Sequence, residues 1–370
     1  MAVKKVVLSH MTALYWLLGH SNYLVDSSIV CRVSPKDAVA AGNDLAQHLL
    51  GIMSYPGKLD CLVCEPRLER RTSCVRTHLS DGKLPAECLI PIECAFDDVD
   101  LFVCRPELVY MQLSKCLSDQ ETIYFGMALC SGFRLEPAAQ GGVVFRQGYD
   151  APLISASKIT SYLQRVPGPR TPKRGLRLIR RVADHARSPK ECALGMLFAL
   201  PVRLGGYGLG SLTFNPEYRV YSGVDRFGDA RYGTRIPDLL LEAKDTHGNK
   251  RAVAVDYDPA STHAGDIKEL LDTRRRNDIA TIRGLPHFAI TSEDIKSFEY
   301  LDLTAERIRR ALGKRVCSSL EGAAESWEGR ERLEEAQRAR RALWRQFVVP
   351  PFEGVIKDLP LEKSKGTRHS

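Results

Sequence analysis

Two short apolar runs, IPDLLL at residues 236–241 and AVAVDYD at residues 252–258, decide the fold of this chain. The polar turn between them contains Gly and Asn, and two apolar runs joined by such a turn predict a β-hairpin. Asp256 and Asp258 are two residues apart, so they share one face of a strand. Asp238 belongs to the partner strand, where it can approach them.

The sequence predicts a metal site at the end of this hairpin. Carboxylates gathered beside apolar strands repel one another and lose hydration, so they usually pair with cations or bind a metal ion. Their hard oxygen atoms suit magnesium, the ion of many sites that cleave phosphodiesters. We therefore expect Asp238 and Asp256 to hold Mg2+ or Mn2+. The alternative is that these acids flank a turn and face water. For Asp258 the two interpretations stay balanced, because Asp-Pro also starts turns.

The composition limits the classes of protein to consider. The chain has 370 residues, of which 44% are hydrophobic, enough for two domains with ordinary cores. Its formal net charge of +8 favours a polyanionic partner only weakly. The apolar stretches are too short to span a bilayer, and we find no signal peptide. Because the eleven cysteines are scattered and odd in number, we expect reduced thiols, a cytoplasmic location and no membrane partner.

The pattern of apolar runs, prolines and charges predicts an α+β protein with two domains. Residues 1–155 form a smaller N-terminal α+β domain, and residues 156–190 form a basic, Pro-containing linker with the first helix of the second domain. The second domain spans residues 175–316 and has the order helix, strand, strand, helix, strand, helix. A charged helix over residues 317–348 and a disordered tail over residues 349–370 complete the chain.

Arginines precede the second domain and recur after its hairpin. Arg177, Arg180 and Arg181 lie in the basic segment, and Arg274 and Arg276 follow the hairpin. The basic segment has two possible interpretations. It is either a surface that holds nucleic-acid phosphates or a face that is merely solvated. In the first interpretation all five arginines contact phosphates.

A series of motif residues runs through the second domain in a fixed order. It comprises an acid on the first helix, an acid on the first strand, an acid pair, a histidine, a helical Asp-x-x-Arg pair and a glycine before the last strand. These are Glu191, Asp238, Asp256 with Asp258, His263, Asp272 with Arg275, and Gly284. The series resembles the PD-(D/E)XK nuclease superfamily and, within it, the very-short-patch-repair-like endonuclease domains. The resemblance covers about residues 175–315 and implies a restriction-endonuclease-like mixed sheet flanked by helices.

The resemblance also implies catalytic roles for the acids. Asp238 and Asp256 would hold the metal ion, while Glu191 and Asp258 would complete its shell or position the attacking water. A simpler interpretation exists for Glu191, because an acid in the first turn of a helix favours the helix dipole without any further function.

Two departures from the family pattern concern the acid pair. The superfamily usually has Glu at the first position, one methylene longer than Asp256, and Lys at the second, where this chain has Asp258. That lysine orients water or stabilises developing charge, so His263 or Lys268 would take over proton transfer and charge stabilisation. A loop histidine also needs no role. Asp272 and Arg275 would support the site, either directly or as a structural ion pair.

The N-terminal region loosely resembles the antitoxins of abortive-infection systems of actinobacteria, at residues 9–14 and 80–85 together with His78. The combined resemblance implies a magnesium-dependent DNA endonuclease or nickase, acting in phage defence or a toxin–antitoxin-like system. The alternative is a non-catalytic regulator that binds DNA or protein on a nuclease-like scaffold. DNA is the expected partner, a homodimer or a protein partner is a further possibility, and we expect no organic cofactor.

Overall fold

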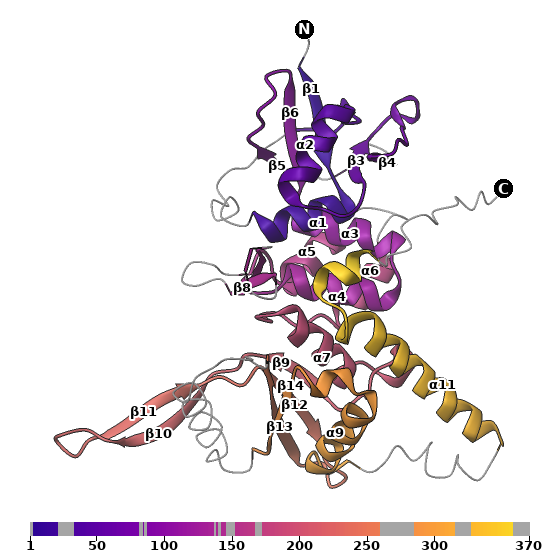
Figure 1. Cartoon of the computed structure of the whole chain (residues 1–370). Coiled ribbons are helices and arrows are strands. Elements are labelled where there is room, and N and C mark those ends of the chain that lie inside the picture. Colours follow the sequence, from indigo (N-terminus) through magenta and orange to yellow (C-terminus); the bar gives the residue numbers. More distant parts are fainter. Residues whose placement is uncertain are drawn as a thin grey trace. The chain divides into compact units, whose positions relative to one another are not determined.

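The chain folds into two compact units. The computed structural model describes residues 3–20, 33–80, 84, 87–136, 138–139, 142–145, 152–166, 172–259, 285–314 and 327–357. Unit 1 comprises Met1–Asp184 and Phe352–Ser370, and unit 2 comprises His185–Pro351. Each unit combines helices with β-sheets, and both large sheets mix parallel and antiparallel pairs (Figure 1). The predicted α+β class is therefore confirmed.

Unit 1 contains a six-stranded sheet with the order β4-β3-β1-β6-β5, in which β2 also pairs with β1. Strand β1 (Lys4–Leu8) ends in three buried residues, runs parallel to β6 (Val99–Cys104) and runs antiparallel to β3 (Leu59–Val63). The other strands of unit 1 are β2 (Ala38–Val39), β4 (Val75–Leu79), β5 (Leu89–Ile92) and the separate pair β7 (Phe133–Leu135) and β8 (Val143–Phe145).

The helices of unit 1 include one that is apolar on nearly every side. Helix α1 buries every residue from 11 to 18, as a helix inside a core does. The helices of unit 1 are α1 (His10–Gly19), α2 (Asn43–Met53), η2 (Pro66–Leu68), α3 (Pro106–Cys116), α4 (Asp119–Leu129), α5 (Ala156–Arg165), α6 (Lys173–Ile179) and α12 (Phe352–Lys357).

A disordered tail is expected over residues 349–370, and helix α12 corrects this expectation for Phe352–Lys357. Its apolar side chains Phe352, Val355 and Ile356 are buried in unit 1. The Phe352 ring lies 5.9 Å from Tyr124 and 6.1 Å from both Phe125 and Phe133, centroid to centroid. The spacing of these apolar residues gives the short helix a buried stripe, which explains why it packs. Residues 358–370 lie outside the described residues.

Helix α6 packs with unit 1, although the sequence analysis assigns residues 175–184 to the second domain. The reason is an ion pair within unit 1. The Arg174 guanidinium lies 2.6 Å from the Asp119 carboxylate and also donates to the carbonyl oxygens of Ser114 and Leu117. The boundary between the units therefore falls between Asp184 and His185.

Unit 2 is built on a four-stranded sheet with the order β14-β13-β12-β9. The predicted hairpin is confirmed: β12 and β13 are antiparallel, with Leu239 opposite Val255 and Lys244 opposite Lys250. Strand β14 runs parallel to β13, so the sheet is mixed. The four strands are β9 (Ser211–Phe214), β12 (Leu239–Lys244), β13 (Lys250–Asp258) and β14 (His287–Thr291).

Helix α7 (Pro189–Ala199) packs closely on this sheet. A β-carbon at Gly195 would lie 2.7 Å from side-chain atoms of both Leu212 and Phe214, so only glycine lets the helix come this near to β9. The close approach matters for the site, because α7 begins near Glu191 and β9 ends one residue before Asn215.

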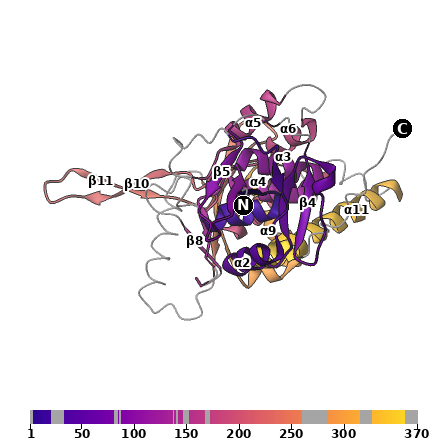
Figure 2. The ribbon, with the colours of Figure 1, turned by 90° about the horizontal axis from the view of Figure 1, so that it is seen from above.

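A separate two-stranded ribbon is inserted between β9 and β12. Strands β10 (Tyr218–Val224) and β11 (Ala230–Arg235) pair antiparallel with a bulge between Tyr221 and Gly223. Figures 1 and 2 show the ribbon extending away from the sheet of unit 2. The sequence analysis does not anticipate this element.

The last part of unit 2 is helical. It contains η4 (Val202–Leu204), η5 (Asp294–Lys296), α9 (Phe298–Ala311), α11 (Trp327–Leu343) and the π-helical turn η7 (Trp344–Val348). The charged helix expected over residues 317–348 is represented by α11 and η7, and residues 315–326 lie outside the described part. Within the described residues, no helix has the length and apolar character needed to cross a membrane.

Candidate active site

The structure brings Asp238 and Asp256 together at one end of the β12–β13 hairpin. The backbone amide of Asp238 donates to Asp256 Oδ1 over 3.0 Å. In return, the amide of Tyr257 donates to Asp238 Oδ2 over 2.8 Å. Each carboxylate is therefore held by the strand that carries the other one. The expected approach of the two acids follows from the antiparallel register of the hairpin.

Asp256 is nearly buried, and a histidine ring lies beside its carboxylate. Asp256 is 8% exposed, and His287 Nε2 lies 3.2 Å from its Oδ2 atom. The His287 Nε2 atom is buried, and in the described part of the chain it has no partner with hydrogen-bond alignment. Strand β14 brings this ring to the site because it runs parallel to β13, with His287 opposite Ala254 and Ala289 opposite Asp256.

Asp258 occupies the end of β13, two residues beyond Asp256. It is half-buried and lies opposite Thr291 of β14. The spacing places its side chain on the same strand face as that of Asp256, as the sequence analysis expects. Burial of the neighbouring Tyr257 raises the pKa of its hydroxyl, and the negative charge of Asp258 adds a smaller contribution in the same direction.

Glu191 lies in the first turn of α7 and is held by neutral donors. Its carboxylate accepts from the Arg187 amide over 2.8 Å, the Ser188 hydroxyl over 2.9 Å and the Asn215 side-chain amide over 3.0 Å. Glu191 is 5% exposed, and this burial raises its pKa above the ordinary value although the three hydrogen bonds oppose the rise. Ser188 also caps the helix by accepting from the Glu191 amide.

Asn215 joins Glu191 to the hairpin. Its side-chain amide donates to Glu191 Oε2, and its backbone amide donates to the Asp238 carbonyl oxygen over 3.0 Å. The backbone of Asn215 has a φ of +51°, a left-handed conformation that asparagine tolerates better than most residues. Its Oδ1 atom is buried and has no hydrogen-bond partner among the residues that the structure describes. A strained, incompletely satisfied residue between two acids is the kind of residue that functional sites contain.

Asn215 and His287 are the two site residues that sequence reasoning does not find. The strand containing His287 is expected, but the histidine receives no role because its place depends on the register of β14 against β13. The signal for Asn215 is its position just after β9, and this becomes visible only when β9 is known to pair with β12.

The ammonium group of Lys190, the neighbour of Glu191, is bound by backbone carbonyl groups. It donates to the carbonyl oxygens of Val348, Val349 and Pro350 over 2.6, 3.1 and 2.7 Å. Burial lowers the pKa of Lys190 to about 8. The side chain therefore ties α7 to the end of η7.

Several expected site residues cannot be placed, because they lie outside the described residues. These are His263, Lys268, Asp272, Arg274, Arg275, Arg276 and Gly284. Of the basic segment, Arg177 forms an ion pair with Asp119 over 3.1 Å, while Arg180 and Arg181 are exposed. All three belong to unit 1, whereas the acids belong to unit 2.

Among the residues that the structure describes, no group of three or more His, Cys, Asp or Glu side chains is arranged to hold a metal ion. Comparison with protein-family models, with curated proteins and with solved structures gives no match for this chain. The interpretation of the site therefore depends on its geometry and on the sequence resemblance.

Proposed function

We propose that unit 2 is a magnesium-dependent DNA endonuclease domain of the PD-(D/E)XK class. The observation that carries this proposal is the pair Asp238 and Asp256. Two carboxylates lie together at the end of a buried hairpin, and each accepts a backbone amide from the segment that carries the other. Carboxylates gathered in this way offer hard oxygen ligands to a cation.

The order of elements supports the same class. Helix α7 carries Glu191, strands β12 and β13 form the acid-bearing hairpin, and β14 lies parallel to β13 before helix α9. The order expected from the sequence is helix, strand, strand, helix, strand, helix. The helix expected between β13 and β14 falls in residues 260–284, outside the described residues, and the other elements occur in the expected order. The supporting observation is the whole succession, because each element alone occurs in many folds.

The acids fit magnesium as a partial site. Mg2+ commonly uses one or two protein carboxylates and keeps several waters, so Asp238 and Asp256 would serve as its carboxylate ligands. Asn215 Oδ1, which has no hydrogen-bond partner among the described residues, would add a further hard oxygen atom near Glu191. When bound, the ion supplies positive charge against the phosphate and acidifies water.

The protein's own groups would position and deprotonate the attacking water. Glu191 has a raised pKa and a carboxylate fixed by Ser188 and Asn215, which suits a group that accepts a proton. Asp258 is the second candidate for this role. The His287 ring of the neighbouring strand β14 lies 3.2 Å from the Asp256 carboxylate. His263 and Lys268 remain the proposed sources of charge stabilisation.

A cleavage assay with the full chain tests this proposal. Supercoiled plasmid, single-stranded DNA and RNA are incubated with Mg2+, with Mn2+ or with EDTA. The variants are Asp238→Asn and Asp256→Asn, because asparagine keeps the oxygen that accepts the backbone amide. Glu334→Gln on exposed α11 is the matched control. We expect divalent-dependent cleavage of DNA that each site variant lowers by about 10²-fold or more and the control leaves unchanged.

The same assay distinguishes the regulator alternative. Asp258 in the position of the usual lysine favours that alternative, since it adds a negative charge where the family has a positive one. If the wild-type chain binds DNA but cleaves none of the substrates with either metal, the endonuclease proposal is wrong and the regulator replaces it. Full activity in either Asp variant would disprove the site assignment.

A further inference from the structure

The β10–β11 ribbon is rooted directly at the candidate active site. Asn215 lies three residues before the ribbon begins, and Asp238 lies three residues after it ends. The Asn215 amide donates to the Asp238 carbonyl oxygen, which closes the base of the ribbon. Tyr218 packs against Leu240 and its neighbours in the sheet. Whatever the ribbon holds is therefore held close to the two acids.

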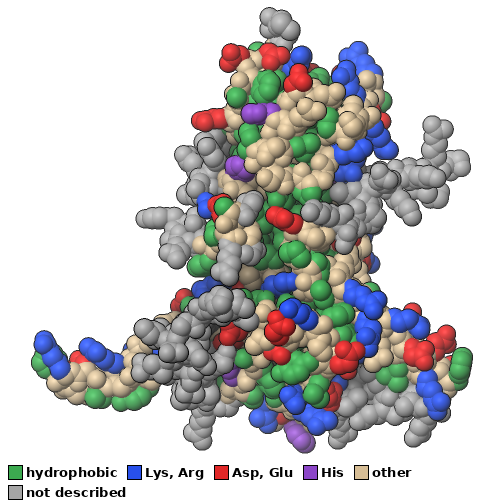
Figure 3. Space-filling model, viewed as in Figure 1, with side chains coloured by type: hydrophobic (Ala, Val, Ile, Leu, Met, Phe, Trp, Pro, Cys, Tyr) green, Lys and Arg blue, Asp and Glu red, His purple; other side chains and the backbone are tan. Residues whose placement is uncertain are grey.

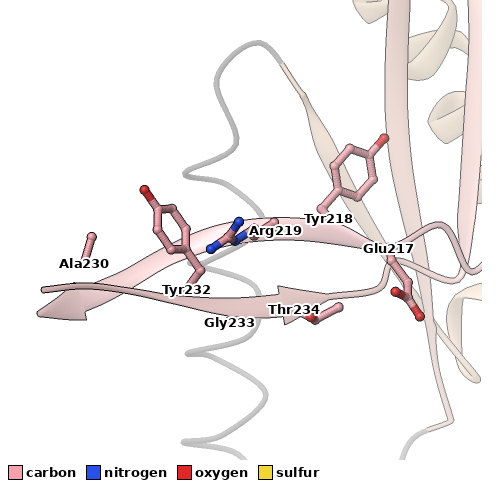
Figure 4. A pocket seen from close by; sticks show the side chains of 7 residues that line it. All are labelled: Glu217, Tyr218, Arg219, Ala230, Tyr232, Gly233 and Thr234. Atoms are coloured by element: carbon pink, nitrogen blue, oxygen red, sulfur yellow. The ribbon is translucent and has the colours of Figure 1, made fainter. Parts of the chain in front are cut away.

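The outer part of the ribbon exposes aromatic rings and arginines. Tyr221 is 60% exposed, Phe227 is 74% exposed and Tyr232 is 51% exposed. Figure 3 shows Lys or Arg side chains along this projecting element, and Figure 4 shows Arg219 beside the Tyr232 ring. The ribbon carries four arginines, Arg219, Arg226, Arg231 and Arg235.

The arginines and the rings are paired with one another. The Arg219 guanidinium lies 4.1 Å from the Tyr232 ring centroid, and the Arg226 guanidinium lies 4.7 Å from the Phe227 centroid. Stacking fixes each guanidinium plane while leaving its N–H donors available. The ribbon thus presents preoriented donors alternating with flat apolar surfaces.

One of the two acids of the ribbon, Asp225, forms its turn. Asp225 Oδ1 accepts from the amides of Phe227 and Asp229 over 2.8 and 3.0 Å. Within the described part of the chain, Arg219, Arg226 and Arg231 form no ion pair. The ribbon arm therefore keeps exposed positive charge although it also contains acids.

We propose that the β10–β11 ribbon inserts into the major groove of double-stranded DNA and holds the duplex against Asp238 and Asp256. The major groove admits a two-stranded β-ribbon, and a seven-residue strand of about 23 Å exceeds the groove depth of roughly 8.5 Å. The arginines match phosphates and guanine edges, and the rings match sugars and thymine methyls. This inference rests on the proposed endonuclease function and adds its substrate class.

The chemistry of the ribbon favours duplex DNA over other partners. Duplex RNA has a deep, narrow major groove that excludes such an arm. A protein-docking face would present continuous apolar surface, whereas here guanidinium groups cover two of the exposed rings. One face of the ribbon carries the paired residues Arg219 and Thr234, and Tyr221 and Tyr232. Val220 points to the other face and is buried, as the alternation of side chains along a strand requires.

Binding is measured with the full chain in EDTA, so that cleavage does not interfere. The probes are a fluorescein-labelled 30-base-pair DNA duplex, the same sequence as duplex RNA, and one single DNA strand. The test variant is Arg219→Ala with Arg231→Ala. The matched control is Arg332→Ala with Arg338→Ala on exposed α11, which removes the same charge from unit 2. Thermal melting verifies that both variants fold.

We expect duplex DNA to bind at least tenfold more tightly than duplex RNA. The ribbon variant should weaken DNA binding about tenfold or more and flatten the salt slope by about 0.9 for each lost phosphate contact. The control should bind as the wild type does.

Other outcomes separate this inference from the proposed function. Wild-type affinity in the ribbon variant, together with normal cleavage, overturns the ribbon inference and leaves the endonuclease standing. DNA binding that depends on the ribbon, without cleavage in Mg2+, supports the inference and contradicts the endonuclease. Equal affinity for duplex RNA or for the single strand overturns insertion into the major groove. The chain could instead self-associate without binding DNA, and Tyr221→Ala with Tyr232→Ala could abolish that self-association. This result would assign the ribbon to contacts with a second copy of the chain and would overturn the inference.

Discussion

Each unit buries carboxylates, and the two sets differ in what neutralises them. In unit 1, Asp60 is fully buried, with the Arg76 guanidinium 2.6 Å and the His78 Nε2 atom 2.8 Å from its Oδ1. Thr12 donates to the other oxygen from its backbone amide and its hydroxyl, at the start of α1. The charge of Asp60 is therefore balanced inside the fold.

In unit 2, Glu191 and Asp256 are almost as deeply buried, but they make contacts of another kind. Glu191 accepts from the Arg187 amide, the Ser188 hydroxyl and the Asn215 side-chain amide. Asp256 accepts from the Asp238 amide and lies 3.2 Å from His287 Nε2. The comparison teaches that burial alone does not distinguish these acids, whereas direct contact with a permanently charged guanidinium identifies Asp60 as a structural acid.

The largest expected effect is on Asp60. Replacing it with Ala removes the fully buried carboxylate that the Arg76 guanidinium contacts, so we expect a loss of about 3–5 kcal/mol in the free energy of unfolding. Asp256→Asn should change stability by less than about 1 kcal/mol, because it keeps the hydrogen-bond acceptor and relieves repulsion. Urea denaturation of both variants measures this, and equal losses would remove the distinction between the two acids.

Metal binding should stabilise unit 2 through its acids. A ligand present at one hundred times its Kd stabilises a folded protein by about 2.7 kcal/mol. We expect Mg2+ to raise the Tm of the wild-type chain and of Glu334→Gln, but not of Asp256→Asn. Scanning fluorimetry over a magnesium series measures the shift. A shift of equal size in Asp256→Asn would show that the ion binds elsewhere.

Acidification should affect the two units in opposite directions. Burial raises the pKa of Glu191 above 4.5, so its contribution to stability is present below pH 4.5 and is lost as the pH rises through the raised value. Burial, with the charges of His78, Arg76 and Lys115, holds the pKa of His10 well below 6.5. Its contribution is present above pH 6.5 and is lost as the pH falls through the lowered value.

Two neutral variants measure these trends separately. The Tm of Glu191→Gln relative to wild type should increase as the pH rises above 4.5, and that of His10→Gln should increase as the pH falls below 6.5. Each tenfold change in proton affinity corresponds to about 1.4 kcal/mol. If the Tm of a variant changes with pH in parallel with the Tm of the wild type, the side chain replaced in that variant has the same pKa in the folded and unfolded states.

The smallest expected effect concerns the basic segment of unit 1. Arg180 and Arg181 are exposed, whereas Arg177 is paired with Asp119. Replacing Arg180 and Arg181 with Ala should flatten the salt dependence of DNA binding by up to about 0.9 for each phosphate contact. Arg177→Ala should have the smaller effect. If the ribbon variant alone changes the slope, unit 2 provides the DNA contacts by itself.

The hairpin and its acid pair could be predicted because apolar alternation and a Gly-Asn turn are local signals. The alternation of residues 252–256 with a partner run places Asp238 beside Asp256 with no knowledge of the remaining fold. Asn215 and His287 could not be found in this way, because their places depend on how β9 and β14 pair with strands distant in sequence.

The ribbon and α12 were missed for different reasons. Strands β10 and β11 are exposed along most of their length, so they lack the apolar periodicity that identifies strands. Helix α12 did carry a signal, since Phe352, Val355 and Ile356 are spaced three and four apart. Six residues are too few for that spacing to stand out beside a polar tail.

The return of the chain to unit 1 sets an order for synthesis. The ring of Phe352 completes a cluster with Tyr124, Phe125 and Phe133, yet all of unit 2 separates these residues along the chain. As the protein leaves the ribosome, unit 1 emerges first but cannot close this cluster until unit 2 has followed. A ribosome that stalls within unit 2 therefore exposes a unit 1 whose aromatic cluster is still uncovered. The cluster can close only when the residues that follow unit 2 have been synthesised.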